Sequence, residues 1–106
     1  MPDSSGKTLF LGVDLGSSGV KAILLSLDRG IVASASKEVA LHSLKTGWAE
    51  ADPQEWWNAF CTLVPQLLEM AKAKSEDVMA VSISGMVPAV LVLNEDKKPL
   101  RNAILQ

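Results

Sequence analysis

A short stretch near the N-terminus combines an acid, glycines, serines and a base, which are residue types that together bind phosphate. Its members are Asp14, Gly16, Ser17, Ser18, Gly19 and Lys21. The glycines can take backbone angles closed to other residues, so that the turn is tight and its N–H groups converge on one anion. Asp14 adds an oxygen ligand of the kind that Mg²⁺ prefers, directly or through its waters. The stretch therefore predicts a phosphate-binding turn that carries its own metal ligand.

The spacing of this turn differs from the two commoner phosphate motifs. Val20 rather than a glycine precedes Lys21, which excludes the pattern Gly-x-x-x-x-Gly-Lys-Ser/Thr. Gly16 and Gly19 stand as Gly-x-x-Gly, which excludes Gly-x-Gly-x-x-Gly. On these residues alone, a β-hairpin whose turn merely needs glycines remains an alternative to the phosphate site.

The composition is typical of a globular protein with its own core. Of the 106 residues, 48% are hydrophobic and 21% are charged. The net charge is −2, and the ten lysines and arginines form no basic stripe, so we expect neither nucleic acid nor an anionic membrane as a partner. The expected partner is a small molecule.

Cysteine usage and the N-terminal residues favour a cytoplasmic location. Cys61 is the single cysteine, which excludes an internal disulfide, and no Cys and His cluster has the spacing of a zinc site. Residues 1–7 are polar and lack the apolar segment of a signal peptide, so we interpret them as a flexible tail. No apolar stretch is long enough to span a bilayer.

Three apolar stretches at the start of the chain predict an antiparallel meander. They span Leu9–Val13, Val20–Leu27 and Ile31–Val39. All are rich in Val, Ile and Leu, and glycine-containing turns separate them. In the third stretch, Ile31, Ala33 and Ala35 alternate with polar residues, which predicts a half-solvated strand near an edge of the sheet.

A capped amphipathic helix is predicted next. Asp52 is a suitable N-cap, Pro53 suits the first helical position, and Glu55 completes a capping box. Pro65 lacks an N–H and crowds a carbonyl one turn back, so we expect a kink or a local break there, and the helix should fade around 72–75. Apolar residues at helical spacing predict one broad face on the sheet, made of Trp56, Trp57, Phe60, Cys61, Leu63, Val64, Leu67, Leu68 and Ala71.

The stretches on either side of this helix are less regular. Residues 41–50 have no periodicity and are interpreted as an ordered loop, in which His42 is a surface residue rather than a ligand. Trp48 either packs on the core, which we favour, or lines a pocket. After the helix, Val78–Ser84 predicts a strand reached by a parallel crossover, and Ala89–Leu93 predicts another strand. The apolar run at 103–105 predicts a longer protein that continues beyond it.

Four motifs in this order resemble the N-terminal end of the FGGY carbohydrate kinases, the family that includes xylulose, gluconate and glycerol kinases. They are the loop Val13–Ser18, the stretch Gly47–Trp57, the strand end Val81–Met86 and the stretch Lys98–Leu105. The resemblance covers the chain from Leu9 onward. It implies that residues 8–106 are the N-terminal part of the first kinase domain.

The resemblance also implies a fold and a reaction. The fold is α/β, part of an actin-like, ribonuclease H-like ATPase domain, in which a three-strand antiparallel meander continues into parallel strands with a packed helix. The reaction is ATP- and Mg²⁺-dependent phosphorylation of a sugar or polyol hydroxyl, in a cleft between two such domains. The catalytic general base and the adenine pocket lie downstream in the family, so the chain alone is expected to be inactive. The complete protein is either a monomer or a homo-oligomer.

Site residues follow from the same likeness. Asp14 would hold magnesium through water and face the sugar hydroxyl. The resemblance places the substrate-side positions at Met86, Val87 and Pro88. The pair Val87-Pro88 stands at the positions where xylulose kinases look to have Met-His and glycerol kinases look to have Arg-Glu. Neither side chain of this pair can form a hydrogen bond. Two interpretations therefore remain, in which the pair either contacts the substrate or simply turns the backbone. The phosphate-binding residues implied are Gly16, Ser17, Ser18 and Lys21.

Two other function classes are carried as hypotheses. An actin-like module of the chaperone or cytoskeletal kind would use the nucleotide to drive conformation, although the stretch Trp48–Trp57 argues against it. Alternatively, the 106 residues form a non-catalytic interaction module, which cooperative melting of the isolated chain would indicate.

Overall fold

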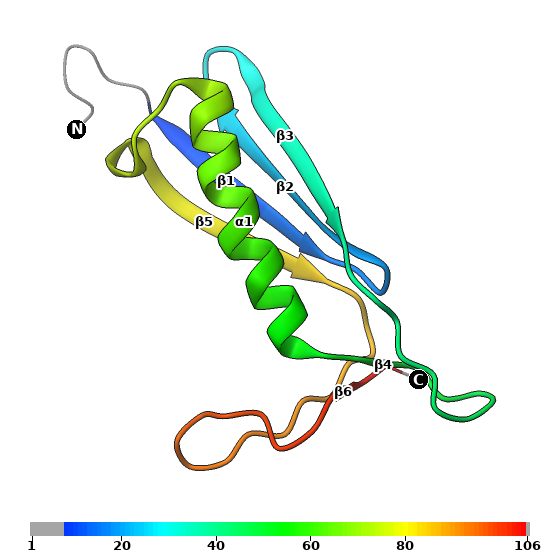
Figure 1. The fold of residues 1–106 in the computed structure, drawn as a ribbon. Coiled ribbons are helices and arrows are strands. Elements are labelled where there is room, and N and C mark those ends of the chain that lie inside the picture. The colour runs from blue at the N-terminus through cyan, green and yellow to red at the C-terminus, as the bar shows by residue number, and fades with distance from the viewer. Residues whose placement is uncertain (1–7, 106) are drawn as a thin grey trace.

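A computed structural model describes residues 8–105 and contains one mixed sheet covered on one face by a helix (Figure 1). The sheet strands are β1 (Leu9–Leu15), β2 (Gly19–Ser26), β3 (Gly30–Glu38) and β5 (Val78–Gly85). Their order is β3-β2-β1-β5, with β1 antiparallel to β2 and parallel to β5. The predicted meander, the edge position of β3 and the parallel crossover are therefore confirmed. The tail predicted for residues 1–7 lies outside the described residues.

The core lies between the sheet and α1 (Pro53–Ala71). Every second residue of β1, namely Leu9, Leu11 and Val13, is at most 4% exposed and faces the helix. On the helix the fully buried residues are Ala59, Leu63 and Leu67, one turn apart. This i, i+4 spacing places them on one line along the helix, as expected for a face that packs on a sheet.

The helical face is narrower than the sequence pattern indicates. Trp57 is 59% exposed and Cys61 is exposed, so the prediction that both lie in the core is wrong. Because α1 packs on β2 and β3 along one stripe, residues two positions away from its members lie about 160° around the helix and point into solvent. The Trp57 ring instead stacks on Phe60, with 5.4 Å between ring centroids.

The N-cap of α1 is confirmed, but the predicted capping box does not form. The Asp52 carboxylate accepts a hydrogen bond from the Gln54 N–H at 2.9 Å, and Pro53 is the first helical residue. The Glu55 carboxylate does not return to the cap; it accepts from the Ala40 N–H and contacts His42. Helical structure runs through Pro65 to Ala71 without the predicted break, and ends at Lys72 in a left-handed conformation.

A second, smaller sheet closes the lower end of the molecule in Figure 1. It pairs β4 (Glu50–Ala51) with β6 (Ala103–Ile104) in antiparallel fashion. Ala51, Ala103 and Leu105 are buried there, with Met86 and Trp56 packed against them. The strand predicted at 89–93 is wrong, since only isolated bridges from Val90 and Leu93 form in that stretch.

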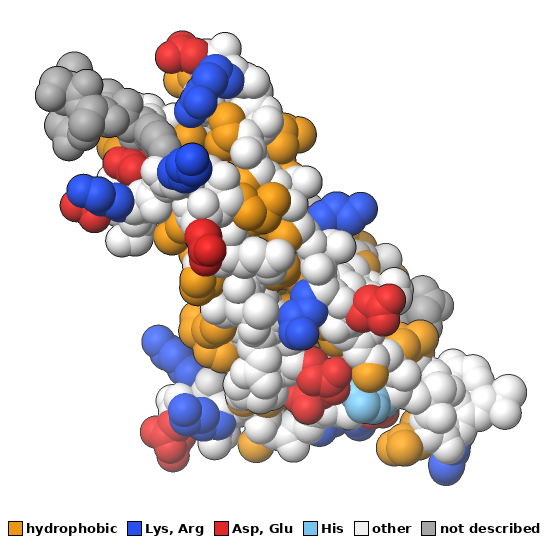
Figure 2. All heavy atoms as spheres, turned by 45° about the horizontal axis from the view of Figure 1, so that its top comes forward, with side chains coloured by type: hydrophobic (Ala, Val, Ile, Leu, Met, Phe, Trp, Pro, Cys, Tyr) orange, Lys and Arg blue, Asp and Glu red, His pale blue; other side chains and the backbone are white. Residues whose placement is uncertain are grey.

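The outer strand β5 carries uncovered apolar side chains. Val81 and Ile83 pair with Leu11 and Val13, which places them on the α1 side of the sheet, yet they are 51% and 61% exposed. Figure 2 shows apolar side chains at the surface of one face, between interspersed charges of both signs. No helix within residues 8–105 is long and apolar enough to cross a membrane.

Candidate functional site

A row of polar residues crosses all four strands of the main sheet. Asp14 on β1 lies opposite Lys21 on β2 and Ser84 on β5, and Lys21 in turn lies opposite Ser36 on β3. Side chains alternate between the two faces of a strand. Since Val13 is buried beneath α1, the row occupies the opposite face, near the carboxyl ends of β1 and β5.

The Asp14 carboxylate at the centre of this row has one defined partner. Ser84 Oγ donates a hydrogen bond to Asp14 Oδ1 at 2.8 Å, and the two residues are 70 positions apart in the chain. Asp14 and Lys21 are both exposed, and they form no ion pair with one another in the described part of the chain. One carboxylate oxygen and one ammonium group are therefore available to a ligand.

Two hollows meet at these residues. Both are lined by Asp14 and Lys21. The hollow of about 300 Å³ is lined in addition by Gly16, Ser18, Gly19, Val20, Ser36, Lys37 and Glu38. The hollow of about 250 Å³ is lined in addition by Gly12, Val13, Ile23, Ser82 and Ser84. The structure thus brings together most of the residues that the sequence assigned to one turn; Ser17 stands beside the larger hollow without lining it.

Hydrogen bonds tie the carbonyls of the turn back onto the fold. Leu15 O accepts from the Met86 N–H at 3.1 Å, and Gly16 O accepts from Trp56 Nε1 at 3.3 Å. Ser18 O accepts from the Val39 N–H at 3.0 Å. The N–H groups of Ser17 and Ser18 have no hydrogen-bond partner among residues 8–105. In the described part of the chain, two N–H groups of the turn are thus left without a partner while its carbonyls at Leu15, Gly16 and Ser18 are bonded, which suits an anion.

The glycines of the turn serve close approach rather than unusual backbone angles. Neither Gly16 nor Gly19 has φ in the left-handed region, so the predicted reason for these glycines is wrong. A Cβ on Gly16 would lie 3.0 Å from Gly19 O, and one on Gly19 would lie 3.0 Å from Lys37 O. Gly16 N–H itself donates to Gly19 O at 2.8 Å, which closes the turn and occupies that donor.

The predicted substrate-side residues follow directly after β5. Met86 is half-buried and belongs to the apolar cluster of the small sheet, while its N–H donates to Leu15 O at the start of the turn. Val87 is 89% exposed, and Pro88, joined to it by a cis peptide bond, is exposed too. The structure therefore brings Met86 to the turn and leaves the two following side chains uncovered.

Two residues of the site were missed by sequence reasoning. Ser84 was assigned only to a strand, although its alternation with Ser82 in an apolar run marks a polar face. Trp56 was assigned only to the core, and no sequence signal indicates that its indole reaches Gly16, 40 residues away in the chain.

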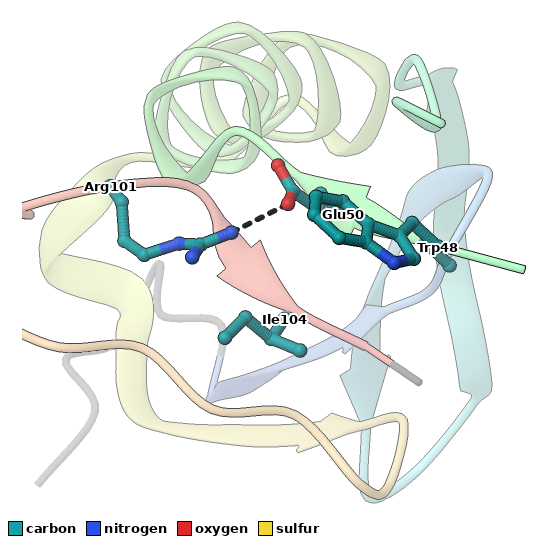
Figure 3. Close-up of a pocket in the computed structure, with 5 residues that line it drawn as sticks. Trp48, Glu50, Arg101 and Ile104 are labelled. Carbon is teal, nitrogen blue, oxygen red and sulfur yellow. Dashed lines mark hydrogen bonds and ion pairs between the residues drawn. The ribbon is translucent and has the colours of Figure 1, made fainter. Parts of the chain in front are cut away.

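A third hollow lies beside the small sheet (Figure 3). It measures about 160 Å³ and is lined by Trp48, Ala49, Glu50, Arg101 and Ile104. Trp48 is 46% exposed, so the favoured prediction of core packing is wrong and the pocket alternative holds. Glu50 is 5% exposed, and its carboxylate binds Arg101 Nη2 at 2.5 Å and Asn102 Nδ2 at 3.4 Å.

A hydrogen bond between two side chains joins the loop after β3 to the first turn of α1. His42 Nε2 lies 2.8 Å from Glu55 Oε2, and both side chains are about one-third exposed. The hydrogen bond from His42, together with that from the Ala40 N–H, holds the pKa of Glu55 below its ordinary value of 4.5. His42 is thus half-buried and links this loop to α1. That it is not a ligand stays a prediction.

The donor set at Asp14 fits a metal ion that keeps most of its waters. Residues 8–105 hold no cluster of three or more His, Cys, Asp or Glu side chains that would enclose a cation. Mg²⁺ commonly binds proteins through one or two carboxylates, with water and substrate phosphates as its other ligands. One exposed carboxylate, oriented by Ser84 and beside a phosphate-type turn, meets that requirement.

Comparison with known proteins connects this site to a family. Residues 9–106 match the N-terminal domain of the FGGY family of carbohydrate kinases. Among curated relatives, the chain is 33% identical to a xylulose kinase of Bacillus subtilis over 95 residues, which are 90% of this chain and 19% of that protein. It is 30% identical to a glycerol kinase of Thermococcus gammatolerans, again over 90% of this chain and 19% of that protein.

Solved structures give the same result. The xylulose kinase of Rhodospirillum rubrum superposes with a TM-score of 0.82 at 34% identity, over 92% of this chain and 20% of that one. The chain thus spans about a fifth of the length of the curated relatives it matches. The fold is the α/β, actin-like ATPase fold of these kinases. The chain belongs to the FGGY family of carbohydrate kinases.

Proposed function

We propose that the complete protein containing this chain transfers the γ-phosphate of ATP to a hydroxyl of a sugar or polyol. The observation that carries the proposal is the row of Ser84, Asp14 and Lys21, set beside a turn whose Ser17 and Ser18 N–H groups have no hydrogen-bond partner within residues 8–105. Phosphoryl transfer requires positioning and charge neutralisation, and this arrangement offers both.

Each site residue has a role in this proposal. Bound ATP with Mg²⁺ supplies the phosphoryl group and neutralises its charge. Asp14 would hold the metal through water and face the acceptor hydroxyl, and the Ser84 hydroxyl fixes the orientation of its carboxylate. Ser17 and Ser18 donate to phosphate oxygens, while Gly16 lets the backbone close. Lys21 contributes a compact positive charge from the neighbouring strand.

The substrate wall is proposed at Met86, Val87 and Pro88, next to the turn. Only their backbone groups and apolar surfaces are available there, so specificity among sugars depends on residues outside this chain. The general base is proposed to lie outside it too, which makes the isolated chain inactive. A cytoplasmic location and homo-oligomerisation of the complete protein stay predictions.

The test is phosphoryl transfer by the complete protein with xylulose, glycerol and gluconate as acceptors. Asp14→Asn should lower kcat on the order of 100-fold, the magnitude typical of losing one preorganised electrostatic contact at a reacting centre. Asp28→Asn, which changes an exposed turn between β2 and β3, is the charge-matched control and should keep wild-type kcat. Full activity of the Asp14 variant would contradict the proposed role.

Other outcomes separate the alternative functions. ATP hydrolysis that no sugar or polyol accelerates would favour an actin-like module of the chaperone or cytoskeletal kind. Absence of nucleotide binding, together with cooperative melting of the isolated chain, would favour an interaction module.

A further inference from the structure

The indole of Trp56 reaches the phosphate turn from the first turn of α1. Its Nε1–H donates to Gly16 O at 3.3 Å, and this bond joins two segments separated by 40 residues. Within residues 8–105, the Leu15 and Ser18 carbonyls of this turn accept from backbone N–H groups, whereas the Gly16 carbonyl accepts from a side chain.

The ring of Trp56 is fixed where two apolar clusters meet. It packs against the main core between the sheet and α1, and also against the cluster of Ala51, Ala103, Leu105 and Met86. A ring held on both sides has little freedom to rotate about χ1 or χ2, so its N–H direction is set by packing. The hydrogen bond to Gly16 is therefore preorganised by the core.

The peptide group that accepts this bond is the one that carries the Ser17 N–H. Gly16 O and Ser17 N belong to the same trans peptide unit, in which the C=O and N–H vectors point in opposite directions. A carbonyl drawn toward Trp56 on α1 consequently directs the Ser17 N–H away from the helix. That N–H has no partner among the described residues, and the residues on either side of it, Gly16 and Ser18, line the larger hollow.

We propose that Trp56 is a positioning residue for nucleotide phosphate: by holding the Gly16 carbonyl, its indole N–H orients the Ser17 N–H toward the phosphate oxygens. The inference rests on the proposed function, because it assigns a ligand to the same turn. Trp56 itself touches neither substrate nor cofactor and acts through the peptide unit between residues 16 and 17.

The experiment compares Trp56→Phe with Trp57→Phe in the complete protein. Phenylalanine keeps an aromatic ring in the cluster but removes the N–H. Trp57 is the matched control because it adjoins Trp56 on the same helix, is 59% exposed, and its indole N–H bonds to nothing within 8–105. Its stacking on Phe60 survives replacement by another aromatic ring.

Steady-state kinetics and nucleotide binding give the readout. Trp56→Phe should raise the KM for ATP about 3- to 10-fold, the range for one neutral hydrogen bond, and leave the KM for the acceptor within about twofold. It should weaken binding of a non-hydrolysable ATP analogue by a similar factor and leave adenosine binding unchanged, because adenosine has no phosphate. A merely structural role would weaken adenosine and the triphosphate alike, and that result would overturn the inference.

Two further outcomes keep this inference distinct from the proposed function. If the wild-type protein transfers phosphate and Trp56→Phe behaves like wild type, only the inference fails. If the wild-type protein binds no nucleotide, both fail. Should Trp56→Phe not fold, hydrogen exchange of wild-type residues 15–19 decides: nucleotide must slow exchange of the Ser17 amide at least tenfold, and unchanged exchange would overturn the inference.

Discussion

Ser84 Oγ donates a hydrogen bond of 2.8 Å to Asp14 Oδ1, joining the carboxyl ends of the parallel strands β5 and β1. The two residues are direct register partners, so the bond needs no distortion of either strand. It fixes the carboxylate that we propose at the centre of the phosphoryl-transfer site.

Ser84→Ala in the complete protein should lower kcat about tenfold while the melting temperature stays within about 2 °C. The physical reason is that an exposed Asp14 without this bond samples several rotamers, of which only some place its oxygen productively. Ser82→Ala, two residues earlier on the same face, is the control and should keep wild-type kcat. Equal kcat values for the two variants would refute an orienting role for Ser84.

Arg101→Ala should destabilise the small sheet by about 1–2 kcal/mol. It leaves Glu50, which is 5% exposed, with only the 3.4 Å contact to Asn102. The expected loss is small because the Arg101 side chain is half exposed and water screens the pair. Hydrogen exchange at β4 and β6 measures the loss. Combining the change with Glu50→Gln should recover part of it, whereas Arg29→Ala, in an exposed turn, should cost nothing.

Leu67→Ala should lower the free energy of unfolding more than Trp57→Ala does, although tryptophan is the larger residue. Leu67 is fully buried, so its truncation should cost about 2–5 kcal/mol of unfolding free energy. Trp57 is 59% exposed and loses mainly its stacking on Phe60, worth about 1 kcal/mol. Chemical denaturation followed by circular dichroism gives both values. A larger loss for Trp57 would mean that its ring is covered in the complete protein.

Glu55 should make stability depend on pH in the acid range. Its pKa is lowered in the folded protein, first by the hydrogen bond from His42, so the unfolded chain binds its proton more readily. The stabilisation is therefore present above the ordinary pKa of 4.5 and is lost as pH falls through the lower folded value. The melting temperature of Glu55→Gln should lie below wild type at pH 6, and the difference should shrink as the pH falls below 4.5.

The control for this pH dependence is Glu95→Gln, which removes an exposed carboxylate in the turn after residue 94. Its melting curve should follow wild type at every pH. A Glu55→Gln difference that persists unchanged below pH 4 would show that the effect comes from packing rather than from titration.

Sequence patterns correctly predicted the elements that depend on a few neighbouring residues. These elements are the meander, the Asp52 cap, the first helical residue Pro53 and the crossover into β5. Errors arose where a distant segment competes for a group. Glu55 was expected to complete a capping box, but Ala40 and His42 take its carboxylate instead. The stretch 89–93 has strand-like composition, yet it finds only isolated bridging partners.

Sequence by itself determined the family, the order of the meander, the helix and the crossover strand, and the candidate residues of one turn, because these depend on residue types and their spacing along the chain. Tertiary structure decided which apolar residues are buried: α1 meets the sheet along one stripe, so Leu63 is covered while Cys61 is not. It also decided that Ser84 and Trp56 contact Asp14 and Gly16 of the candidate site. Both reach the turn through contacts across 40 or more residues, and only strand register and helix packing set such contacts.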